Sequence, residues 1–208
     1  MVPSNAPIAD ILPLLPPEAA KPEGPSHRRI RAASRVLAAL FSVLLAADAL
    51  FVLGLMLAFF IPALGRHVGI GPVGMLLSFG VELPHPYVAV HTLSLIRRLA
   101  HVAMGVLALS PALLIFWNLR RLFGLYGQGR VFARENAVHI KWIGVWLAAD
   151  ALAPFVVHLA LNALHLAIDQ HWMHLYSLQE LVLGGVVYVI ALVMEQGHAI
   201  EEEQGQFV

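Results

Sequence analysis

The sequence contains no cysteine and few charged residues. Without cysteine, the chain can form no disulfide, no thiolate metal site and no cysteine nucleophile. Charged residues make up 12% of its 208 residues and hydrophobic residues 59%, whereas a soluble domain has roughly 25% charged residues. The mean hydropathy is +0.76, and the apolar residues form blocks too long for core helices. These properties predict an integral membrane protein whose first partner is the lipid bilayer.

The 13 basic and 13 acidic residues balance to a net charge of zero. They are concentrated in a few connectors and at the termini, with no pattern typical of a nucleic-acid surface, so we expect no direct binding to nucleic acid. The connector between residues 118 and 144 holds five of the basic residues: Arg120, Arg121, Arg130, Arg134 and Lys141. Since Lys and Arg are enriched in short cytoplasmic loops, this connector is expected on the cytoplasmic side.

Four apolar stretches are long enough to cross a bilayer, which takes about 20 residues. The sequence therefore predicts an all-α integral membrane protein with a bundle of four transmembrane helices. We place the spans at about 36–64, 99–119, 142–167 and 175–194, within a membrane domain of residues 28–198. The proline-rich residues 1–27 are expected to be a disordered cytoplasmic tail, and residues 199–208 an acidic C-terminal tail.

Glycine and proline interrupt the connector between the first two predicted spans, residues 65–98. We expect it to form an external loop with one interfacial or re-entrant segment, because irregular backbone at membrane depth must be covered by protein or water. With both termini cytoplasmic, the external side carries only Arg66, Arg97 and Arg98 of the thirteen basic residues. The opposite orientation would place most of the positive charge outside.

Polar residues inside the predicted spans are the candidate functional groups. They are Asp48, His101, Asp150, His158, Asn162, His165, Glu180 and Tyr188. Asp48 lies 13 residues beyond Arg35, roughly 20 Å along a helix, and so near the membrane centre. A carboxyl there is costly unless it is neutral or paired.

In the third predicted span, polar residues and one proline recur every three or four residues from Asp150 to His165, so they share one helix face. Lipid cannot satisfy these groups, and the face should contact other helices or a wet cavity. A short link at residues 170–174 would form an antiparallel hairpin that places His165 level with Glu180 and Asp150 near Glu195. Structural hydrogen bonding and a proton or cation pathway both fit this pattern.

Eleven histidines raise the question of a metal site. His171 and His174 form an HxxH pair, and His101 could join His165 and Glu180 near the external surface. Neither an HExxH pair nor a compact group of His and carboxylate residues at short spacing is present. We therefore predict no metal site and no cofactor.

The segment GQGRVFARENAVHIKWIG, which begins at Gly127, resembles the cytoplasmic loop of a bacterial family of four-span membrane proteins of unknown function (DUF2975). The residues that carry the resemblance are Gly129, Val131, Phe132, Glu135 and Asn136, and the similarity extends over about residues 36–208. It implies a multi-pass protein of the bacterial inner membrane, with no catalytic residues to carry over.

Three functions are compatible with these patterns. The leading hypothesis is a non-enzymatic regulatory, scaffold or accessory membrane component with a protein partner or a second copy, because no nucleophile, base and oxyanion constellation is present. The second is a small-solute, proton or cation transporter acting as an oligomer. The third is a metal- or haem-binding membrane subunit.

The predicted topology can be tested with reporter fusions at Gly127 and after Val208. Both fusions are expected to report a cytoplasmic location, because ten of the thirteen basic residues then lie on that side. A periplasmic signal from either fusion would overturn the orientation.

Overall fold

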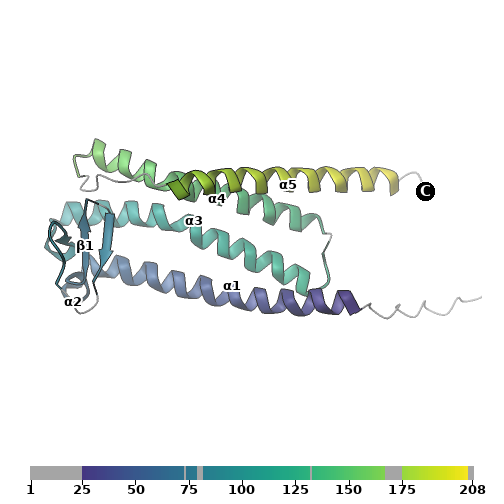
Figure 1. Ribbon diagram of the computed structural model, residues 1–208, viewed down its shortest axis with the longest axis horizontal. Coiled ribbons are helices and arrows are strands. Elements are labelled where there is room, and N and C mark those ends of the chain that lie inside the picture. The colour runs from purple at the N-terminus through teal and green to yellow at the C-terminus, as the bar shows by residue number, and fades with distance from the viewer. Residues whose placement is uncertain (1–24, 73, 79–81, 132, 167–174, 206–208) are drawn as a thin grey trace, which may run out of the picture.

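The computed structural model describes residues 25–72, 74–78, 82–131, 133–166 and 175–205. Most of the predicted proline-rich tail lies outside these ranges, as do Phe132 and the His171 and His174 pair. The described part of the chain contains four long helices and one small sheet (Figure 1).

The long helices are α1 (Pro25–Ala58), α3 (Leu95–Gly127), α4 (Arg134–Ala163) and α5 (Leu175–Gly205). Each contains an apolar segment long enough to cross a membrane, which confirms the predicted four-span, multi-pass architecture. The helices pack in chain order, α1 on α3, α3 on α4 and α4 on α5 (Figure 1). The result is an open row of helices in which each contacts mainly its neighbours in the sequence.

The start of α1, the end of α3, the start of α4 and the end of α5 lie at one end of the molecule (Figure 1). We call it the arginine end. Its basic residues include Arg28, Arg29, Arg31, Arg35, Arg120, Arg121, Arg130 and Arg134. The side of the membrane that this end faces stays a prediction.

Two predicted boundaries were wrong. The first span was placed up to Leu64, but α1 ends at Ala58 and a short helix α2 (Pro62–Gly65) follows. Pro62 accounts for the break, because the residue before a proline is driven out of the helical region, and Ile61 is extended with φ −99° and ψ 108°. The basic connector is also much shorter than residues 118–144. Helical geometry continues in α3 through Gly127, so only residues 128–133 separate α3 from α4.

The connector between α1 and α3 folds into a three-stranded antiparallel sheet, which the sequence analysis did not predict. Its strands are β1 (Val68–Gly71), β2 (Gly74–Leu77) and β3 (Val88–Ala89), in the order β2-β1-β3. A 3-10 helix, η2 (Val90–Thr92), leads from β3 towards α3. Strands of two to four residues rich in glycine are too short to give a clear alternating pattern.

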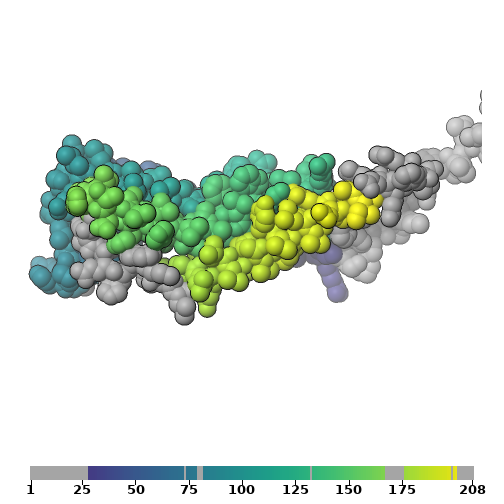
Figure 2. Space-filling model, turned by 90° about the horizontal axis from the view of Figure 1, so that it is seen from above, coloured from purple at the N-terminus to yellow at the C-terminus, as the bar shows by residue number. Residues whose placement is uncertain are grey.

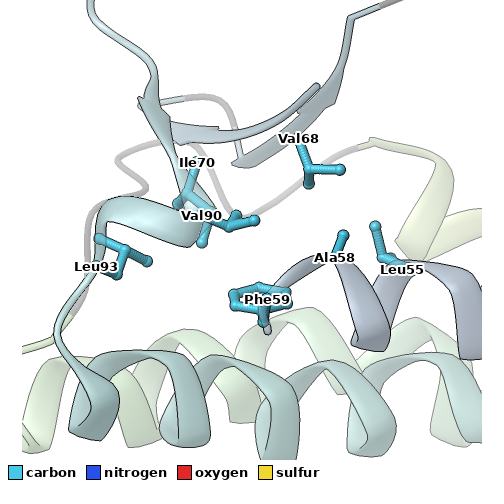
Figure 3. Packing of buried hydrophobic residues seen from close by; sticks show 7 residues of the cluster. All are labelled: Leu55, Ala58, Phe59, Val68, Ile70, Val90 and Leu93. Carbon is cyan, nitrogen blue, oxygen red and sulfur yellow. The ribbon is translucent and has the colours of Figure 1, made fainter. Parts of the chain in front are cut away.

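A hydrophobic cluster joins this sheet to the end of α1 (Figure 3). Its buried members are Leu55, Ala58, Phe59, Val68, Ile70, Val90 and Leu93. Phe59 and Val90 are fully buried at 0% exposure. The guanidinium of Arg98 donates to the carbonyl oxygens of Leu93 at 2.8 Å and Phe59 at 3.3 Å, so it satisfies backbone groups that the ends of α1 and η2 leave open.

Small residues set the close helix contacts. A side chain at Gly144 would meet the backbone nitrogen of Tyr188 at 2.7 Å, and one at Gly184 would meet the nitrogen of Ala148 at 2.9 Å. The backbones of α4 and α5 therefore cross at these glycines, as is common between membrane helices. Between α1 and α3, Met56 packs at Gly105.

A proline within α3 is compensated locally. Pro111 has no N–H group to donate to the carbonyl of Leu107, four residues earlier. The hydroxyl of Ser110 donates to this Leu107 oxygen at 3.2 Å. Ser110 thus has a structural role, since its hydroxyl replaces the missing amide donor.

We expect Phe59→Ala to lower the free energy of unfolding by about 3 to 5 kcal/mol, because the substitution leaves a cavity in the only fully buried aromatic position of the described cluster. Phe60→Ala is the matched control, since the Phe60 side chain is 44% exposed. Denaturant titration of both variants in detergent micelles measures the difference. Equal losses in the two variants would show that the cluster does not hold the sheet to α1.

Candidate functional site

The register between α4 and α5 decides which polar groups meet. The Gly144 and Gly184 crossing places the middle of α4 against the middle of α5. Asp150 thereby comes close enough to Glu180 for the two carboxyls to interact electrostatically. In Figure 2, α5 in yellow-green begins well inside the end of α4 in green. The predicted level pairing of His165 with Glu180 was therefore wrong, by about four helical turns.

The error has a physical cause at the end of α4. The helix ends at Ala163, and α5 begins at Leu175, so the link is longer than the five residues expected. His165 adopts a left-handed conformation with φ 56°. Its N–H donates to the oxygen of Asn162 at 2.9 Å, and the N–H of Leu166 to that of Leu161 at 2.8 Å. This is a Schellman cap with histidine where glycine is usual.

The polar face becomes more exposed towards the end of α4. Asn162 and His165 are exposed, whereas His158 is half-buried. The expected pairing of Asp150 with Glu195 is also wrong. The Glu195 carboxylate instead accepts from the Lys141 ammonium at 3.1 Å. The same ammonium lies over the Tyr188 ring, 5.9 Å from its centre. Tyr188 therefore makes a cation–π contact with the Lys141 of this ion pair.

Asp150 of α4 has two other carboxyl groups within electrostatic range, Glu180 of α5 and Asp48 of α1. One carboxyl oxygen of Asp48, Oδ2, is buried and has no hydrogen-bond partner among the described residues. Each carboxyl in apolar surroundings needs a proton or a donor. We call Asp48, Asp150 and Glu180 the carboxyl cluster.

A cavity adjoins the carboxyl cluster between α4 and α5. It has a volume of about 230 Å³ and is lined by Ala151, Pro154 and Ser177 together with apolar side chains. The Ser177 hydroxyl is buried without a hydrogen-bond partner among the described residues. Pro154 also removes the amide that would bond to the carbonyl of Asp150. Polar groups therefore border a largely apolar cavity.

His101 has a structural environment. It is 7% exposed, its ring lies 6.5 Å from that of Phe59, and its Nδ1 donates to the carbonyl of Arg97 at 2.8 Å. The possible grouping of His101 with His165 and Glu180 is not formed. Within the described ranges, no three His, Asp or Glu side chains are arranged to hold a metal ion.

The loop between α3 and α4 is held by its own residues. Gly129 has φ +85° and closes a second Schellman cap, in which the N–H of Arg130 donates to the oxygen of Leu125 at 3.0 Å. The fully buried Asn136 donates its side-chain amide to the oxygens of Arg130 and Val131, both at 2.7 Å. Gly127 was also expected to form a turn, but it is the last residue of α3.

Charged side chains fasten the loop on both sides. Glu135 forms an ion pair with Arg130 at 2.6 Å. The Arg31 guanidinium of α1 lies over Gly129, where a side chain would meet it at 2.7 Å. Sequence reasoning missed this contact, because two distant segments of the same charge gave no signal for pairing. It also missed the bond between His139 Nδ1 and Asn118 Oδ1 at 3.0 Å.

Comparison with known proteins gives one match. The profile of a family described as "Protein of unknown function (DUF2975)" matches residues 81–206, which is more than half of the chain. No curated protein and no solved structure matches the chain.

The cap of α4 gives a direct test of the corrected register. We expect His165→Gly to raise the free energy of unfolding by about 1 kcal/mol, because glycine has no side chain to oppose the left-handed conformation. His165→Ala is the matched control and should not stabilise. Denaturant titration in micelles measures both. Destabilisation by His165→Gly as large as that of Glu180→Leu would point back to a buried pair.

Proposed function

The chain belongs to the DUF2975 family of proteins of unknown function, and we propose that it is a non-enzymatic regulatory or accessory component of the bacterial inner membrane that assembles laterally with another membrane protein. The observation that carries this proposal is the open row of helices, in which α1 packs mainly on α3 and its most apolar stretch has no buried residue.

The α1 helix has little cover. It packs mainly on α3, and in its most apolar stretch no residue is buried by the rest of the protein. The exposed face of α1 is therefore the surface of the row on which another membrane protein can pack without displacing a helix of this chain.

The faces of α1 around Asp48 can be distinguished by residue spacing. Leu44 and Phe51 lie within about 60° of Asp48 on a helical wheel, whereas Val43 and Leu50 lie on the other side. The second pair is more exposed, at 66% and 68% against 37% and 48%. Phe41 lies on the Asp48 side and stacks on Phe116 and Phe123 of α3. A lateral partner therefore contacts the more exposed pair.

This difference can be measured without background labelling, because the chain has no cysteine. Single Val43→Cys and Leu50→Cys variants, labelled with benzophenone maleimide in native membranes and irradiated, are expected to give protein adducts. Leu44→Cys and Phe51→Cys are matched controls on the side of the same helix that lies towards α3, and they should give few. A second copy of this chain or a different protein is then identified from the adduct mass.

Adducts in equal yield at all four positions would show random contact, and no adducts at Val43 and Leu50 would show that lipid covers the exposed face. Either result would exclude lateral assembly at this face of α1.

A second candidate function rests on a separate observation. The carboxyl cluster lies beside a cavity of about 230 Å³ with an unpaired Ser177 hydroxyl, and such groups mark proton and ion pathways in membranes. Proton or Na⁺ flux into liposomes that contain the purified chain, lost in Asp150→Asn, would support transport. Retained adducts together with absent flux favour the accessory role.

A further inference from the structure

A second cavity lies at the arginine end, between the last turns of α3 and the start of α4. Its volume is about 620 Å³. Arg120, Arg121 and Arg130 line it, together with Glu135 and His139. It differs from the largely apolar cavity between α4 and α5, because three of the residues that line it carry guanidinium groups.

The charges in this cavity are unbalanced. Glu135 supplies the single carboxylate of the lining, and it is already paired with Arg130 at 2.6 Å. Among the described residues, Arg120 and Arg121 form no ion pair. Their guanidinium carbons lie 5.6 Å and 4.9 Å from the centre of the Trp117 ring. An anion would supply the missing negative charge, and the planar fork of arginine fits phosphate oxygens in particular.

Trp117 indicates the depth of the cavity in the membrane. Tryptophan is enriched at the membrane–water interface, and the Trp117 side chain is 42% exposed. Arg120 and Arg121 follow it by about one helical turn, roughly 5 Å further along α3. This distance places the two guanidinium groups beside the phosphates of the lipid headgroups.

The cavity walls are held in place before any ligand binds. His139 is fixed by its bond to Asn118, which also donates to the carbonyl of Leu114 at 2.8 Å. The Gly129 cap and the Asn136 side chain fix the loop that carries Arg130. A preformed site loses less conformational entropy on binding.

We propose that this cavity binds the phosphate of an anionic phospholipid headgroup, with Arg120 and Arg121 as the principal contacts. Basic cavities between membrane helices recognise lipid headgroups through the same chemistry. The site is separate from the face of α1 around Asp48 and does not depend on lateral assembly.

The test uses the purified full chain in detergent, with native mass spectrometry during titration with phosphatidylglycerol or phosphatidylcholine. We expect phosphatidylglycerol to bind more tightly, and the Arg120→Gln and Arg121→Gln double variant to weaken it about tenfold or more, as expected for lost charge-assisted hydrogen bonds. Arg28→Gln with Arg29→Gln is the matched control. It removes the same charge at the same end from two exposed residues outside the cavity lining.

Equal weakening in the control would show general electrostatic attraction, and equal binding of the two lipids would show no headgroup selection. Either result overturns the proposal. Inorganic phosphate is the competitor. Displacement of phosphatidylglycerol by millimolar phosphate would assign the site to the free anion instead of a lipid.

Arg120→Lys with Arg121→Lys keeps the charge and guards against misfolding of the glutamine variant. We expect it to retain the preference for phosphatidylglycerol but to bind severalfold more weakly, because lysine cannot form the paired contact. Binding by this variant equal to that of the unaltered chain would exclude the arginine geometry as the basis of recognition.

Discussion

Polar groups that are buried away from water need hydrogen-bond partners, and this constraint accounts for several of the polar contacts in the structure. The Ser110 hydroxyl bonds to the carbonyl that Pro111 leaves open. Arg98 bonds to the carbonyls at the ends of α1 and η2, and Asn136 to those of the α3–α4 loop. Among the described residues, four buried side-chain atoms have no hydrogen-bond partner: Asp48 Oδ2, His91 Nδ1, Asn136 Oδ1 and Ser177 Oγ. Two of the four, on Asp48 and Ser177, belong to the carboxyl cluster or line its cavity.

The membrane class and the four helices could be predicted because they follow from the length and composition of apolar runs. Proximity between helices could not be predicted in the same way. The pairing of His165 with Glu180 depended on where α4 ends, and that end is set by a left-handed histidine, a residue without the usual glycine signal. The small sheet was missed for a related reason, because strands of two to four residues carry too little pattern. Helix identity is local, whereas register depends on a few backbone angles in the connections.

The candidate site was predicted residue by residue but not as an arrangement. Asp48, Asp150 and Glu180 each stood out as a charge in an apolar span, and burial in lipid implied that each needs a partner. The proximity of Asp150 to Glu180 depends on the crossing at Gly144 and Gly184, where the lack of side chains lets α4 and α5 approach closely. Two small residues therefore determine which acidic groups of these two helices lie near each other. At the arginine end, the close contact of Arg31 with Gly129 likewise depends on a residue without a side chain.

The helices are also longer than a bilayer requires. The 33 residues of α3 correspond to about 50 Å at 1.5 Å per residue, whereas the hydrocarbon layer is about 30 Å thick. Since Trp117 marks one interface, the ten residues from Asn118 to Gly127 rise about 15 Å above it. The ends of α3 and α5 and the start of α4 thus project beyond the headgroups. A soluble protein that approaches this face of the membrane would meet these helix ends before it meets lipid.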